Sequence, residues 1–144
     1  MLRRYRTRIS GPLLDRIDLH LEVPSLGVNE IIADRWEESS EVIRARVVSA
    51  CEIQHERLKD DPGVYCNAHM TTREVRRHCM LSVSCSTLLR GAVETLGLSA
   101  RAYDRILKVA RTLADLDGAD VIVEKHIAEA IHYRSLDRRT SKPV

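Results

Sequence analysis

The 144-residue chain carries 23 lysines and arginines against 21 aspartates and glutamates, a net charge of +2 that excludes a polycation coating nucleic acid along its whole length. This length supports one domain, and an aromatic content of 3% requires an aliphatic core. No apolar run approaches the roughly 20 residues that span a bilayer, and no signal-peptide pattern is present. We therefore expect a cytoplasmic protein with no membrane partner.

The first predicted element is a strand at residues 17–23, where apolar and polar residues alternate strictly before Pro24. A short apolar stretch at residues 121–123 is the only comparable run. Because a single strand cannot satisfy its own backbone hydrogen bonds, its sheet is expected elsewhere. Residues 121–123 and a second copy of the chain stay open as other partners for this strand.

Helical spacing of apolar residues predicts helices over the remainder. They are expected at about residues 40–59, 72–79, 84–96, 100–117 and 124–135. The predicted N-caps are Ser39 or Ser40, Thr71 or Thr72, and Ser99, and the predicted ends include Gly97 and Gly118. The fold class is therefore mainly α, a helical bundle preceded by one orphaned strand.

Two of these helices have a clear apolar face. In the first helix this face comprises Ile43, Val47, Ala50, Cys51, Gln54 and Leu58. In the helix after Ser99 it comprises Tyr103, Ile106, Leu107, Ala110, Leu113 and Ala114. The polar face of that second helix carries Arg101, Asp104, Arg105, Lys108, Arg111 and Asp115. We expect Asp104 to pair with Lys108, and Arg111 to pair with Asp115, one turn apart along the helix.

The cysteine and histidine residues give a weak zinc pattern. Cys66 and His69 are three residues apart, while His78 and Cys79 are adjacent and Cys85 follows. One ion rarely accommodates an adjacent pair, since structural zinc sites use two spaced pairs. We expect reduced thiols and no metal.

No nucleotide-binding or hydrolase motif is present. The sequence has no phosphate-binding P-loop, no dinucleotide-binding glycine pattern and no nucleophile elbow. The chain is therefore not expected to hold a nucleotide in the usual way.

Arg16 is the strongest single candidate for a functional residue. It follows a turn at Gly11 and Pro12 and directly precedes the predicted strand, which would anchor it. A guanidinium delivered to another subunit can stabilise charge on a transferring phosphoryl group. From the residues alone, this role and a surface salt bridge with Asp15 or Asp18 are equally open.

A basic cluster near the N-terminus is a second candidate site. It consists of Arg3, Arg4, Arg6 and Arg8. These side chains could contact phosphate or DNA, although exposed basic segments are commonly only solvated.

Three segments together carry a resemblance to a known family. They are "YRTRISGPLLDRIDLHLEVP" at residues 5–24, "LSARAYDRILKVARTLADL" at 98–116 and "HIAEAIHYRSLDR" at 126–138. In order and spacing they resemble the C-terminal portion of the magnesium-chelatase-like AAA+ ATPases, the family that includes competence proteins. The Walker A and Walker B motifs of that family are missing here, so the chain looks like a fragment that begins inside the AAA+ core.

The resemblance implies roles for three arginines. Arg16 matches the arginine finger that reaches the ATP of a neighbouring subunit. Arg101 matches the second sensor, which contacts the terminal phosphate from the lid, and Arg105 is the alternative. The helix near residues 39–58 matches an inserted helix that repositions the lid.

The resemblance also implies a domain division and partners. Residues 1–24 would end the AAA+ core, 25–38 would form a linker, 39–136 a helical lid domain and 137–144 a flexible tail. The longer protein of which this chain would be a fragment would use ATP and Mg²⁺, with other subunits of its ring and DNA as partners. This chain alone would bind neither cofactor and would be inactive. The alternatives are a stand-alone basic DNA-binding module and a purely structural oligomerisation domain.

Overall fold

The computed structural model describes residues 16–25 and 38–134 and is mainly helical over them. The elements are α4 (Ser40–Leu58), the 3₁₀ helix η1 (Asn67–His69), α5 (Thr72–His78), α6 (Val83–Leu96), α7 (Ala100–Leu116) and α8 (Glu124–His132). The predicted helical lid-type bundle is therefore confirmed. The short helix η1 lies between the first two predicted helices, where no element was expected.

Local capping chemistry places the helix ends close to the predicted positions. The Ser39 Oγ accepts a hydrogen bond from the Val42 backbone N–H at 3.4 Å, and Ser99 caps α7 in the same way at 3.2 Å. Thr71 and Glu74 form a reciprocal capping box at the start of α5. Gly97 ends α6 with a φ of 63°, a left-handed conformation that favours glycine.

Most helix boundaries that differ from the sequence-based expectation do so by one residue, and the end of α8 differs by about three. Helix α6 begins one residue earlier than predicted, because the Ser82 hydroxyl accepts from the Cys85 backbone N–H and caps it. Helix α8 ends at His132, with Tyr133 as its C-cap, whereas the pattern predicted a helix to about residue 135. Residue 135 itself lies outside the described part of the chain.

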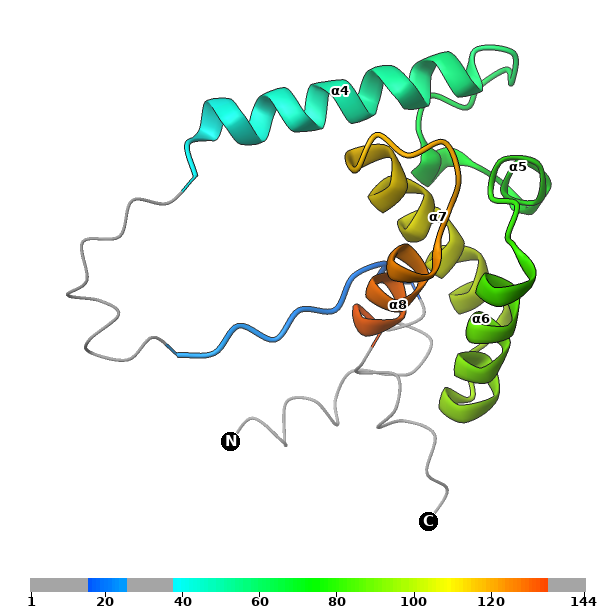
Figure 1. Cartoon of the computed structure of the whole chain (residues 1–144). Coiled ribbons are helices and arrows are strands. Elements are labelled where there is room, and N and C mark those ends of the chain that lie inside the picture. The colour runs from blue at the N-terminus through cyan, green and yellow to red at the C-terminus, as the bar shows by residue number, and fades with distance from the viewer. Residues whose placement is uncertain (1–15, 26–37, 135–144) are drawn as a thin grey trace.

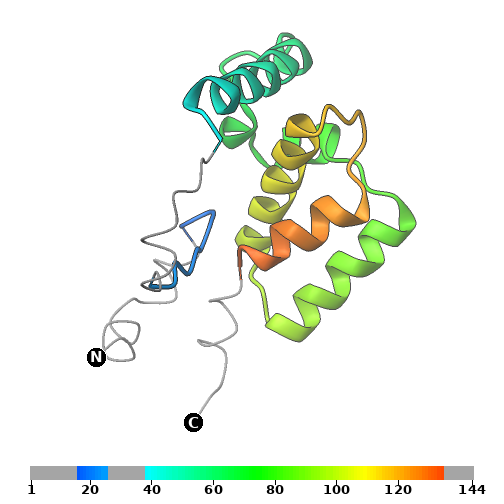
Figure 2. The ribbon, with the colours of Figure 1, turned by 60° about the vertical axis from the view of Figure 1, so that its left-hand side comes forward.

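Helix α7 is the centre of the bundle. It packs against α4, η1, α5 and α8, while α6 lies beside α8 (Figures 1 and 2). Alanines at positions 102, 110 and 114 of α7 are fully buried, and their small side chains allow neighbouring helices to approach closely. The aliphatic core around them includes Leu58, Met70, Val75, Leu89, Ile106, Leu107, Ile122 and Ile127.

Only the C-terminal half of α4 packs on this core. Ala50, Gln54 and Leu58 are buried, whereas residues 40–49 are all exposed. Ile43, Val47 and Cys51 of the predicted apolar face are therefore exposed in the described structure. The reason is geometric, because the N-terminal half of α4 extends past the end of the bundle (Figure 1).

Residues 16–25 lie against the bundle without regular secondary structure. Their apolar side chains at positions 17, 19, 21 and 23 are exposed, so the described residues do not bury the apolar face of the predicted strand. Pairing with residues 121–123 is not found, since Ile122 is buried in the helical core. The core strand itself stays a prediction.

Candidate functional site

The segment that carries Arg16 is attached to the helical bundle directly after this residue. The Arg134 Nη1 donates to the Ile17 carbonyl at 2.5 Å, and the His20 backbone N–H donates to the Tyr133 carbonyl at 2.8 Å. Between them, the Asp18 carboxylate forms an ion pair with Arg105. Arg16 itself is exposed, in a turn just before these contacts. We refer to these three contacts, made by residues 17, 18 and 20, as the clasp.

Arg134 is the most buried member of the clasp. Its relative exposure is 1%, although it carries a positive charge. A buried guanidinium is costly unless its donors are hydrogen-bonded, so its bond to the Ile17 carbonyl is a strong constraint on that backbone. Arg134 was not among the functional residues expected from the sequence. It lies inside the third family-like segment, but its neighbours in sequence give no sign of a partner at residue 17.

The two sensor candidates lie one helical turn apart on α7 and have different surroundings. Arg101 is exposed in the first turn, and no hydrogen bond or ion pair joins it to another described residue. The Arg105 side chain is 29% exposed and is engaged by Asp18. The structure therefore brings Arg105, and not Arg101, to the segment that carries Arg16.

The alternative interpretation of Arg16, a salt bridge with Asp18, is not found, and Asp18 pairs with Arg105 instead. The other proposed partner, Asp15, lies outside the described residues, as do Arg3, Arg4, Arg6 and Arg8. The N-terminal basic cluster thus remains a sequence-based prediction.

A buried charged cluster fastens α4 and η1 to α7. The Asp115 carboxylate accepts hydrogen bonds from Arg57, from the Asn67 amide at 2.8 Å and from the Arg111 Nε at 3.1 Å. Arg111 also donates to the carbonyls of residues 119 and 120 in the loop before α8, at 2.6 and 2.9 Å. Burial lowers the pKa of Arg111.

This cluster corrects one expectation and confirms another. Arg111 and Asp115 do interact along α7, as their spacing predicted, but they are buried and do not lie on a solvated face. The second predicted pair is not seen as an ion pair, since Lys108 donates to the Ala68 carbonyl and Asp104 accepts from Thr72. The cluster is saturated with internal bonds, so its role is to hold helices together.

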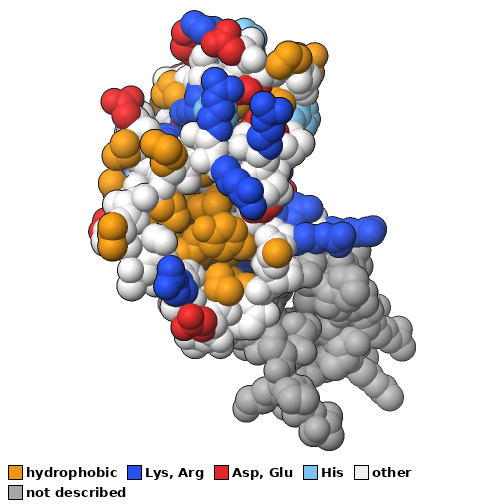
Figure 3. All heavy atoms as spheres, turned by 90° about the vertical axis from the view of Figure 1, so that its right-hand side faces the viewer, with side chains coloured by type: hydrophobic (Ala, Val, Ile, Leu, Met, Phe, Trp, Pro, Cys, Tyr) orange, Lys and Arg blue, Asp and Glu red, His pale blue; other side chains and the backbone are white. Residues whose placement is uncertain are grey.

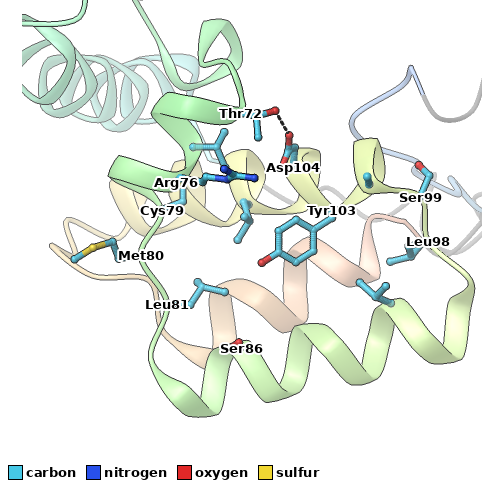
Figure 4. A pocket seen from close by; sticks show the side chains of 14 residues that line it. Thr72, Arg76, Cys79, Met80, Leu81, Ser86, Leu98, Ser99, Tyr103 and Asp104 are labelled. Carbon is cyan, nitrogen blue, oxygen red and sulfur yellow. Dashed lines mark hydrogen bonds between the residues drawn. The ribbon is translucent and has the colours of Figure 1, made fainter.

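A groove with a volume of about 820 Å³ lies between α5, α6 and α7. Figure 3 shows apolar side chains in the hollow and basic side chains beside it. Tyr103 points into the groove, and Arg76 lies at its rim near the Thr72 to Asp104 hydrogen bond (Figure 4). Burial raises the pKa of the Cys79 thiol in its wall to about 11. This thiol is therefore protonated at neutral pH and is a poor nucleophile.

The described residues contain neither a metal site nor a membrane-spanning helix. The four cysteines are free, and no group of three or more histidine, cysteine, aspartate or glutamate side chains in residues 16–25 and 38–134 is arranged to hold a metal ion. None of the described helices is both long and apolar enough to cross a bilayer.

Comparison with protein families gives two matches. The family model described as "Magnesium chelatase, subunit ChlI C-terminal" matches residues 37–134. The model described as "Magnesium chelatase, subunit ChlI" matches residues 1–31. The first match covers the whole helical bundle, and the second includes Arg16 and the residues of the clasp on its segment.

Similar curated proteins are much longer than this chain. The competence protein ComM of Haemophilus influenzae is 45% identical over 141 residues, which are 96% of this chain and 26% of that protein. The uncharacterized protein YifB of Escherichia coli is 42% identical over 137 residues, which are 94% of this chain and 26% of that protein. An uncharacterized protein of Mycobacterium tuberculosis is 36% identical over 95% of this chain and 27% of its own length. The chain thus spans about a quarter of the length of these relatives.

Proposed function

Because this chain belongs to the family of magnesium chelatase ChlI C-terminal domains, we propose that it completes the ATP-hydrolysing site of a longer AAA+ protein that works as a ring. The observation that carries this proposal is the setting of Arg16. Its guanidinium is exposed at a turn, and the residues directly after it are attached to the helical bundle by the clasp. An arginine on a fixed base is what a finger reaching into another subunit requires.

In the proposed mechanism Arg16 acts in trans. Its planar guanidinium binds phosphate oxygens of a neighbour's nucleotide and stabilises the charge that spreads over them as the phosphoryl group transfers. This chain contributes no P-loop, and its described residues offer no carboxylate group arranged for a cation. ATP and Mg²⁺ would therefore be held by other parts of the ring, and the contribution of this chain would be cationic.

We assign the sensor role to Arg101 in preference to Arg105. Arg101 is exposed in the first turn of α7, where its guanidinium is accessible to a phosphate. Arg105 is already paired with Asp18, and a phosphate would have to displace that carboxylate. Arg101 would then detect whether the terminal phosphate is present.

The work of the whole protein is a further part of the proposal. One relative is named a competence protein, and the family resemblance implies ATP-driven DNA remodelling, such as helicase or branch-migration activity. The competing hypothesis of a stand-alone DNA-binding module requires that the 144-residue chain alone bind DNA with an affinity that falls steeply with salt. A flat titration at low salt would exclude that module.

Substitution of the two arginines in the longer protein tests the proposal. Arg16→Ala is expected to lower kcat by about 10²–10³-fold, the usual cost of losing one donor to transition-state charge. Its affinity for ATP should change far less than kcat, because the guanidinium acts mainly on charge that develops in the transition state. Arg101→Ala should lower kcat as well. Arg90→Ala, an exposed arginine on α6, is the matched control. Wild-type turnover by Arg16→Ala would contradict the proposal.

A further inference from the structure

We propose that Arg105 and Arg134 are positioning residues, which clasp the finger segment to α7 and α8 so that Arg16 moves together with these two helices. This inference rests on the proposed function of Arg16 and adds a mechanical link that the finger assignment does not contain. Its evidence is the set of polar contacts that surround residues 17–20.

The contacts of the clasp are directional. They hold the Ile17 carbonyl, the Asp18 carboxylate and the His20 backbone N–H, which are three different groups on neighbouring residues. They come from two different elements, Arg105 in α7 and residues 133–134 directly after α8. A backbone held at several points within four residues has little freedom to rotate, and Arg16 is joined to it by one peptide bond.

Apolar burial contributes little to holding this segment. Leu21 and Val23 are 67% and 87% exposed, and Ile17 and Leu19 are also exposed. The His20 side chain is buried against the bundle instead. Because hydrogen bonds and ion pairs depend on direction and distance, an attachment made of them fixes orientation as well as proximity.

The clasp gives Arg105 a function that differs from sensing phosphate. Arg105 acts on Arg16 through Asp18, and it lies one turn after Arg101 on the same helix. A movement of α7 would therefore displace both Arg101 and the base of Arg16. Arg101, the proposed sensor, is thus mechanically linked through α7 and Arg105 to Arg16, which serves the ATP site of the neighbouring subunit.

A charge exchange in the 144-residue chain tests the clasp without any ATPase activity. The readout is hydrogen exchange of the His20 amide, whose N–H is bonded to the Tyr133 carbonyl. Asp18→Arg and Arg105→Asp should each speed this exchange by about tenfold or more, because the segment opens more often. The double variant, with the charges exchanged, should restore slow exchange. Arg90→Asp makes the same charge change on exposed α6 and should have no effect.

Turnover of the longer protein provides the functional readout. Each single variant should lower kcat by about tenfold or more with unchanged ATP affinity, since misplacing a catalytic group by about 1 Å is enough. The double variant should recover turnover. Arg134→Met keeps the aliphatic stem and removes the hydrogen-bond donors, and it should lower kcat in the same way. Thermal unfolding checks that each variant is folded.

The outcomes separate the clasp from the finger. If Arg16→Ala turns over like the wild type, the proposed function fails and the positioning role fails with it. If Arg16→Ala is slow while the clasp variants have wild-type kcat, the finger stands and the clasp is overturned. Unchanged His20 exchange in both single variants would also overturn the clasp.

Discussion

Asp115 is the residue on which the attachment of α4 and η1 to α7 depends. Its side chain is fully buried and faces the guanidinium groups of Arg57 and Arg111. We predict that Asp115→Asn lowers the free energy of unfolding by about 3–5 kcal/mol, because the buried Arg111 and the partly buried Arg57 lose their counter-charge. Urea denaturation measures the loss. Asp120→Asn, an exposed carboxylate close by, should leave stability unchanged, and an equal effect of both changes would contradict this role.

Cys79 makes stability depend on pH in the alkaline range. Its pKa is raised from an ordinary value of 9.0 to about 11 by burial. A raised folded-state pKa gives stability that is complete below the unfolded pKa and is lost as pH rises, here between about 9 and 11. We predict that the melting temperature of Cys79→Ala falls less steeply than that of the wild type over this window.

The exposed Cys51 provides the control for that measurement. Cys51→Ala should keep the wild-type slope of melting temperature against pH, because this thiol is exposed. Equal slopes for the wild type and for Cys79→Ala would show that the alkaline loss of stability comes from other groups.

At the scale of elements, helix α4 divides into a packed half and a projecting half. Leu58 is 2% exposed in the core, whereas Ile43 is 43% exposed. We predict that Leu58→Ala lowers the free energy of unfolding of this chain by about 2–5 kcal/mol. Ile43→Ala should cost less than about 0.5 kcal/mol, as for other surface changes. Comparable losses in urea denaturation would mean that the N-terminal half of α4 is packed.

The helix boundaries could be predicted from the sequence because they depend on local chemistry. Ser39, Thr71 and Ser99 cap residues only two or three positions away, and Gly97 needs only its own φ. The sequence therefore located the helices of the bundle to within a few residues. The family could be predicted from the resemblance, because three long segments in a fixed order and spacing are specific to it.

Features that depend on distant partners could not be predicted. Arg57 and Asp115 are 58 positions apart, and Arg134 and Ile17 are 117 apart. The polar residues of α7 look alike in sequence, yet Arg111 is buried by its partners from other elements while Arg101 is exposed. The clasp at the candidate site could be found only from the structure for the same reason.

At the scale of the whole molecule, many of the exposed apolar side chains lie on two parts at the edge of the bundle. These are residues 16–25 and the N-terminal half of α4, which extend away from α6 and the groove (Figure 1). In the proposed longer protein, we expect the sheet of the AAA+ core to cover the first part. The clasp would then join the helical bundle to the part of the AAA+ core that carries Arg16 in the same subunit.

The measurement that tests the central claim most directly mixes two inactive forms of the longer protein. One form carries Arg16→Ala and still binds ATP, and the other keeps Arg16 but cannot bind ATP. If Arg16 acts in a neighbour's site, random mixing in equal amounts should restore about a quarter of wild-type ATPase activity, because each active site needs one subunit of each kind in the right order. Activity no greater than that of the two separate forms would contradict the account, since Arg16 would then serve its own subunit or no site.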